Sequence, residues 1–176
     1  MSRRALIHLN QTVLMPDLDP GLVLKSVRTL QEELFIRPNP NGAWILNRYD
    51  TALLGLLDEL SAEQASAQPI PGRSSIAGHV NHLRFSLGLL NRWAEGENPY
   101  ADADWAGSWN IQSVTEAEWQ QLRNALRDEV NAWIEALQVP RPLDEMSLTG
   151  VIASAAHVAY HVGAVRQLLG LVEETA

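Results

Sequence analysis

SLTGVIASAAHVAYHVGAVRQLLGLV, residues 147–172, is the stretch around which the rest of the chain is organised. Its uninterrupted apolar character predicts one long helix. On a helix, side chains four residues apart lie on one face, one turn above the other, so His157 and His161 share a face. The rest of that face is apolar and small-sided around the histidines, and it carries Gly150, Ala153, Ala164, Leu168 and Leu171.

Two histidines on an apolar helix face allow two interpretations. A buried imidazole without a partner costs kilocalories, so each ring needs a hydrogen bond or a ligand. One metal ion shared by His157 and His161 would satisfy both rings. Two separate core histidines, each bonded to a carbonyl oxygen, would satisfy them as well. The His-x-x-x-His spacing is by itself a weak metal signal, and taken alone it favours the second interpretation.

The composition limits the class of protein. The chain has 176 residues, of which 46% are hydrophobic and 19% charged, a balance typical of a globular domain with its own core. The net charge is −8 and no basic run is longer than Arg3-Arg4, which argues against a nucleic-acid partner. The absence of cysteine excludes disulfides and any protein thiolate as nucleophile or ligand.

The apolar segments do not predict export or membrane insertion. Near the N-terminus, His8 and Asn10 interrupt the apolar run, unlike a secretory signal, so we expect a cytoplasmic protein. Residues 146–165 lack charge and meet the length rule for a membrane span. Two histidines would then lie in the bilayer, and the other expected helices are amphipathic, so we expect no membrane partner.

Apolar spacing predicts an all-α fold, because no segment alternates as a strand does. A Ser-x-x-Gln sequence at 61–64 predicts a capping box and a short extra turn, and Thr115 with Glu118 predicts another box. The expected architecture is an antiparallel four-helix bundle in residues 42–176, preceded by an extension, residues 1–41, that adds one helix to the same compact domain. The expected helices span residues 20–36, 43–60, 75–93, 115–138 and 147–172.

Three further side chains are candidates to line or support a site. Residues 96–114 form a long loop, and such loops are often functional in compact domains. Trp105 and Trp109 in this loop either form the wall of a pocket or hold the loop on the core. Asp50 lies at the edge of an apolar stripe, where it is either solvated or ion-paired, or else supports a metal-bound histidine.

Four of the five histidines fall in just two expected helices, and His8 stands alone near the terminus. One expected helix carries His79 and His82, and another carries His157 and His161. If these two helices are neighbours, three imidazoles could converge. Three neutral nitrogen donors leave a coordination position open, as in catalytic metal sites. Without an acidic ligand the site stays positive, which favours an anionic fourth ligand such as hydroxide or thiolate.

Three motifs resemble the DinB/YfiT-like superfamily of metalloenzymes over residues 42–172. They are Leu-x-x-Leu-Ser-Ala-Glu-Gln from residue 57, Pro-x-Pro-Gly-x-Ser-Ser-Ile-Ala-Gly-His-Val-Asn-His-Leu from residue 69, and Ala-His-Val-Ala-Tyr-His-Val-Gly from residue 156. The spacing from Ser75 to His82 fits the family pattern. The resemblance therefore implies that His82, His157 and His161 bind the metal, and that His79 lies in the pocket or behind a ligand.

The resemblance also implies a four-helix bundle that holds a divalent metal, zinc or nickel, together with a low-molecular-weight thiol as cosubstrate. Relatives of this kind are thiol-dependent S-transferases and isomerases. We therefore expect a metal-dependent enzyme that activates a small thiol toward a small-molecule substrate. The alternatives are a hydrolase that uses metal-bound water and a non-catalytic bundle that binds metal or ligand. The family often has Gly-Gln after the last histidine, where this chain has Gly163-Ala164, which weakens the transfer of any particular activity.

The back of the last helix predicts self-association. Ala155, Ala159 and Gly163 point away from the histidines and let another helix approach closely. Either the helix over 20–36 covers this face, or a second copy of the chain does. The resemblance favours a homodimer.

Overall fold

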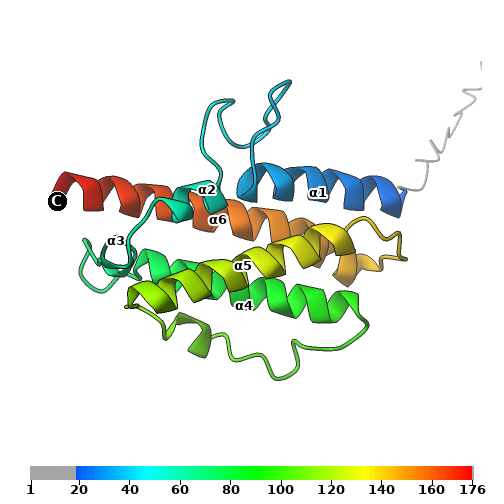
Figure 1. The fold of residues 1–176 in the computed structure, drawn as a ribbon. Helices are drawn as coiled ribbons and strands as arrows, with labels where there is room; N and C mark the ends of the chain where they lie inside the picture. Colours follow the sequence, from blue (N-terminus) through cyan, green and yellow to red (C-terminus); the bar gives the residue numbers. More distant parts are fainter. Residues whose placement is uncertain (1–18, 176) are drawn as a thin grey trace, which may run out of the picture.

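The computed structural model describes residues 19–175, and in this part of the chain every regular element is helical (Figure 1). The all-α prediction is therefore confirmed for the described residues. The elements are α1 (Pro20–Phe35), α2 (Leu53–Asp58), α3 (Ala62–Ser66), α4 (Ile76–Ala94), the 3₁₀ turn η1 (Gly107–Trp109), α5 (Glu116–Ala136) and α6 (Glu145–Thr175). His8 lies outside the described residues.

Side-chain caps set the starts of three helices, as the sequence predicts. Ser61 and Thr115 each form a reciprocal capping box, with Gln64 and Glu118 as the partners three residues later. The Ser75 hydroxyl accepts the amide hydrogen of Gly78 at 3.1 Å and begins α4. These caps satisfy amide groups that have no partner inside their own helix, so they fix where each helix begins.

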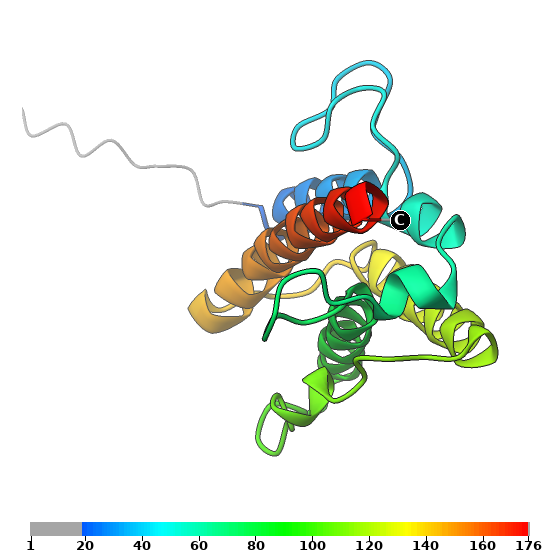
Figure 2. The same ribbon diagram turned by 90° about the vertical axis from the view of Figure 1, so that its left-hand side faces the viewer.

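Four long helices enclose the core (Figures 1 and 2). Helix α4 packs against α5 and α6, and α1 packs against the same two helices from the other side. Each long helix contributes fully or nearly fully buried side chains to one cluster. Burying one such apolar side chain stabilises the fold by roughly 1.5–3 kcal/mol. Helix α1 is therefore part of the common core. Representative members of the cluster are Leu34, Phe35, Leu83, Leu87, Trp119, Leu126, Val158 and Val165.

The helix expected over residues 43–60 is wrong for most of its length. Only Leu53–Asp58 is helical, and the preceding residues form a loop that projects beside α1 (Figure 2). The Asn47 amide donates to the Asp50 carboxylate at 3.0 Å, and the Asp50 amide donates to the Asn47 carbonyl at 3.0 Å. Such local bonds replace the helical ladder. The apolar spacing was misleading, because Tyr49 of the expected stripe is 89% exposed.

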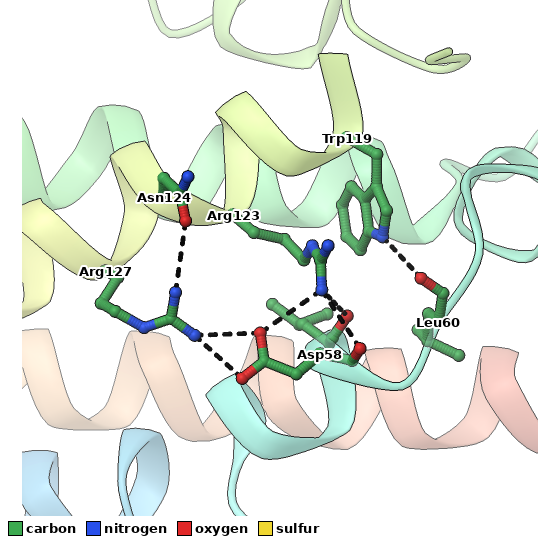
Figure 3. A network of polar contacts seen from close by, with 7 residues as sticks. Asp58, Leu60, Trp119, Arg123, Asn124 and Arg127 are labelled. Carbon is green, nitrogen blue, oxygen red and sulfur yellow. Dashed lines mark hydrogen bonds and ion pairs between the residues drawn. The ribbon is translucent and has the colours of Figure 1, made fainter. Parts of the chain in front are cut away.

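Polar contacts hold α2 on α5 (Figure 3). The Trp119 indole donates to the Leu60 carbonyl at 2.8 Å. The Arg127 guanidinium donates to both carboxylate oxygens of Asp58 at 2.9 Å, and Arg123 reaches the same carboxylate at 3.3 Å. The short α2 is thus fixed against a long helix by contacts outside its own six residues.

Helix α6 is central and apolar. By length and composition, its span Glu145–Glu174 could cross a membrane, a test that the core helices of soluble proteins also pass. In this structure α6 packs against α1 and α4. Val151, Val158 and Val165 on its inner face are at most 1% exposed. The same inner region carries the histidines toward α4.

Candidate metal centre

Helices α4 and α6 bring three imidazoles together. The Nε2 atom of His157 lies 3.1 Å from Nε2 of His82 and 2.9 Å from Nε2 of His161. His82 comes from the middle of α4, whereas His157 and His161 are one turn apart on α6. His82 and His161 are buried and His157 is half-buried. The structure therefore forms a cluster, His82, His157 and His161, whose donor atoms could hold one metal ion.

The geometry and charge state of the cluster fit a metal ion. Burial, followed by repulsion from the neighbouring imidazoles, lowers the pKa of His82 to about 4 and that of His161 to about 3. Burial also lowers the pKa of His157. The rings are therefore neutral at pH 7 and offer lone pairs. In a tetrahedral zinc site with Zn–N distances of about 2.0–2.1 Å, ligand nitrogens lie about 3.3 Å apart, close to the spacing here.

The outward nitrogen of His82 is oriented by η1. Its Nδ1 lies 2.7 Å from the Ser108 hydroxyl oxygen, and that hydroxyl donates its own hydrogen to the Trp105 carbonyl at 2.6 Å. The Ser108 oxygen can therefore only accept from His82, which places the proton of His82 on Nδ1. The lone pair of His82 is then on Nε2, facing the cluster, as a metal ligand requires.

His79 lies behind His161 instead of joining the cluster. Its Nδ1 is 2.9 Å from Nδ1 of His161, on the side of that ring opposite the cluster. When Nε2 of His161 presents its lone pair to the cluster, Nδ1 of His161 carries the proton and donates it to His79. His79 thus orients His161 as Ser108 orients His82.

The other candidate residues separate into two groups. Trp109 stacks on His82 with ring centroids 4.1 Å apart and an interplanar angle of 18°, and its ring also meets the edge of His79. The ring centroids of Trp105 and His82 lie 5.9 Å apart. Asp50 is not part of this group, because its carboxylate contacts Asn47 and forms an ion pair with Arg166 at 3.3 Å.

Sequence reasoning did not identify Ser108. A serine in a long loop carries no pattern that places it on a histidine. The Gly107-Ser108-Trp109 turn reaches the cluster because the Asn81 side-chain amide of α4 donates to the Ser108 carbonyl at 2.7 Å. The presence of the candidate Trp109 in this turn was the available signal.

Removing either supporting side chain should weaken the metal site without abolishing it. We expect Ser108→Ala and His79→Ala to lower metal affinity about 10–100-fold, because the ligand ring loses the group that fixes its tautomer. Competition with a chromophoric chelator measures this affinity. Ser113→Ala, an exposed serine of the same loop, is the matched control. Unchanged affinity in both variants would contradict the supporting role.

The lowered pKa values predict how the stability of the metal-free protein depends on pH. Between the ordinary histidine value of 6.5 and about 4, the unfolded chain binds protons that folded His82 and His161 do not. The free energy of unfolding should therefore fall as the pH decreases through this window, by about 1.4 kcal/mol per pH unit for each extra proton bound by the unfolded chain. Above about pH 6.5 these histidines are neutral in both the folded and the unfolded chain, so their titration no longer lowers the free energy of unfolding.

Urea unfolding between about pH 7 and pH 4.5 measures the effect, and the double variant His82→Ala/His161→Ala is the reference, since other groups titrate in both proteins. The wild type should lose more stability than the double variant over this interval. Parallel pH profiles for the two proteins would contradict the prediction.

A comparison with known families agrees with this geometry. The model of the DinB superfamily matches residues 46–165, which include both histidine-bearing helices up to Val165. No match was found among curated proteins or among solved structures. The match covers more than half of the chain and contains every member of the three-histidine cluster. The chain therefore belongs to the DinB superfamily.

Proposed function

We propose that this protein is a metal-dependent enzyme in which His82, His157 and His161 hold one divalent ion and a small thiol attacks an electrophilic small molecule. The observation that carries the proposal is the convergence of three neutral imidazoles: Nε2 of His157 contacts Nε2 of both His82 and His161, and one donor atom from each ring lies within 4.8 Å of the others. An ion bound there would supply Lewis acidity and favour the deprotonated form of a thiol or of water.

The donor set supports zinc or nickel, which imidazole nitrogen suits well. The cluster contains no carboxylate, so an ion held by it keeps its full positive charge, which favours an anionic sulfur over a neutral ligand. The chain has no cysteine, so the thiol has to come from a separate molecule. During attack on an arene, the sulfur forms a bond to the electrophilic carbon, the thiol proton passes to solvent, and the bond from that carbon to its leaving group breaks. The leaving group departs as an anion with the bonding electron pair.

The arrangement of the helices supports the same proposal. We infer that α1, α4, α5 and α6 form the four-helix bundle of the family, since each of these helices packs against two of the others. Helix α1 then takes the place that the sequence had suggested for residues 43–60. The ligand-bearing helices α4 and α6 are direct neighbours in this arrangement.

Hydrolysis by the same cluster is the second candidate, and metal binding without turnover is the third. A cavity beside His157 favours the two enzymatic candidates, because a purely structural site is closed by protein ligands. Thiol transfer and hydrolysis differ in the nucleophile, and only an assay with both nucleophiles distinguishes them.

The test is an assay of metal-loaded protein. Protein loaded with Zn²⁺ or Ni²⁺ is incubated with an uncharged electrophilic arene and a panel of small thiols, and thioether formation is followed by mass spectrometry. We expect thiol-dependent turnover that His157→Ala eliminates. Turnover of an ester substrate without any thiol would instead support hydrolysis. Stoichiometric metal without either turnover would support a binding protein.

Self-association is part of the proposal. Helix α1 covers part of the back of α6, where Ala155 and Val162 are buried. Other residues on this side of α6 are exposed, with Ile152 52% and Tyr160 71% accessible. We expect a homodimer through this exposed face. Gly163→Arg should give a monomer near 19.5 kDa in light scattering while metal binding persists, because a Cβ atom added at Gly163 meets nothing within 4 Å in the single chain. Gln120→Arg, on the exposed side of α5, is the control. A wild-type mass near 19.5 kDa would overturn the dimer.

A further inference from the structure

A large cavity lies beside the histidine cluster. Its volume is about 830 Å³, and it is bounded by the second half of α4, the first half of α6 and the loop between α4 and η1. Its walls include Ser86, Leu90, Trp93, Tyr100, Trp105 and His157. The volume is in the range of sites that enclose drug-sized molecules.

The cavity reaches the cluster through one ligand. His157 is half-buried and lines the cavity, whereas His82 and His161 are buried and do not line it. Trp105 lines the cavity, and its ring centroid lies 5.9 Å from that of His82. A molecule in the cavity therefore meets the cluster on the side of His157, and the other two histidines hold the site from behind.

The walls favour a flat apolar molecule. Three aromatic rings, those of Trp93, Tyr100 and Trp105, face the cavity, and Leu90 adds an aliphatic surface. Aromatic walls bind flat rings by stacking and by edge contacts. The Ser86 hydroxyl donates to the Leu83 carbonyl at 3.0 Å, so its oxygen remains free to accept a hydrogen bond from a ligand.

The charges at the cavity disfavour an anion. Glu97 and Asp144 line it, and no arginine or lysine of the described residues does. Arg92 pairs with Glu97 at 2.7 Å and offsets its charge, so the net negative charge at the wall comes from Asp144. Arg141 donates to the carbonyls of Ala94 and Ala136. A carboxylate or sulfonate entering here would meet like charge and lose its hydration without compensation.

We propose that this cavity binds the electrophilic acceptor, and that the acceptor is an aromatic, largely apolar molecule without negative charge. The inference rests on the proposed function for the identity of the acceptor, but the binding specificity follows from the cavity alone. The thiol then reaches the cluster from solvent beside the half-buried His157 and supplies the sulfur.

Two fluorescent probes with the same ring system test the charge preference. N-phenyl-1-naphthylamine is neutral, and 1-anilinonaphthalene-8-sulfonate adds one negative charge. Titration of the metal-free protein should show one neutral probe per chain and at least about tenfold weaker binding of the sulfonate. The metal-loaded protein should bind the neutral probe as well, whereas its ion, next to the cavity through His157, attracts the sulfonate, so the charge preference is read from the metal-free protein. The metal-free arm separates this inference from the proposed function, because a chain that binds no metal can still bind the neutral probe.

Two pairs of variants locate the probe. Gly150 and Ala153 line the cavity, and we expect Gly150→Phe and Ala153→Phe each to weaken binding of the neutral probe about tenfold or more by occupying its volume. Gly42→Phe, in the loop before α2, and Ala132→Phe, on α5, alter exposed positions away from the cavity and from the exposed face of α6, and they should leave binding unchanged. A Cβ atom added at Gly150 or Gly42 meets nothing within 4 Å, so the backbone at both positions has room for a side chain.

Four results would overturn the inference. The first is absence of binding of the neutral probe, and the second is equal or tighter binding of the sulfonate by the metal-free protein. The third is loss of binding in the control variants to the same extent as in the cavity variants, and the fourth is unchanged binding in all four variants. Circular dichroism of each variant confirms that the helical fold is retained, so that loss of binding reports on the cavity.

Discussion

Replacing His82, His157 or His161 singly with alanine is expected to abolish stoichiometric metal binding. Nε2 of His157 lies 3.1 Å from Nε2 of His82 and 2.9 Å from Nε2 of His161, and each variant leaves only two of these protein ligands. Two imidazoles without a third donor do not form the three-ligand set of a catalytic zinc site. Metal per chain, measured by mass spectrometry after loading and desalting, should fall from about one to near zero.

His79→Ala is the matched control, since it removes an imidazole from the same region without removing a cluster nitrogen. It should retain stoichiometric metal, although with weaker affinity. Loss of metal in His79→Ala together with retention in His82→Ala would show that the ligands on α4 are misassigned.

Replacing Glu33 with alanine is expected to produce a large loss of stability away from the metal centre. Glu33 is 2% exposed, and its carboxylate accepts the amide hydrogens of Trp44, Ile45 and Leu46 at 2.7–2.8 Å. Hydrogen bonds to a charged group contribute about 1.5–3 kcal/mol each, and three of them are lost together. The free energy of unfolding in urea should decrease by at least about 3 kcal/mol.

Two variants sharpen this prediction. Glu33→Gln keeps one acceptor oxygen and should be intermediate. Glu32→Ala removes the neighbouring carboxylate, whose ion pair with Arg28 is partly exposed, and should cost less than about 1 kcal/mol. Equal losses for Glu32→Ala and Glu33→Ala would contradict a specific role for the buried carboxylate.

The elements that could be predicted from the sequence are those whose signals are local. The capping boxes at Ser61 and Thr115 lie within four residues of the chain and were placed correctly. Helix α6 was predicted from its own composition, and the structure extends it to Glu145–Thr175. The pairing of His157 with His161 follows from helix geometry alone.

The elements that failed depend on contacts between distant segments. The apolar spacing in residues 43–60 resembled a helix, but Glu33 on α1 binds the backbone of residues 44–46, and Asn47 with Asp50 forms a local turn. No pattern within the segment reveals an acceptor supplied by another helix. Ser108 was missed for the same reason, since its role depends on a contact with His82, which lies 26 positions away in the sequence.

Helix α1 shows the same limitation at the level of architecture. The sequence predicted its existence but treated it as an addition to a bundle that began at residue 42. In the structure it packs on α5 and α6, and the Gln31 amide donates to the Ser154 hydroxyl of α6 at 3.0 Å. Which helices are neighbours is decided by the match of buried faces, and periodicity within one helix does not encode it.

X-ray absorption spectroscopy of the zinc- or nickel-loaded protein tests the central claim most directly. The account predicts one ion per chain with three imidazole nitrogens at about 2.0–2.1 Å for zinc, and a loss of the imidazole scattering in His82→Ala, His157→Ala and His161→Ala. A protein that binds no stoichiometric metal, or an ion surrounded by oxygen ligands without imidazole scattering, would contradict the three-histidine centre.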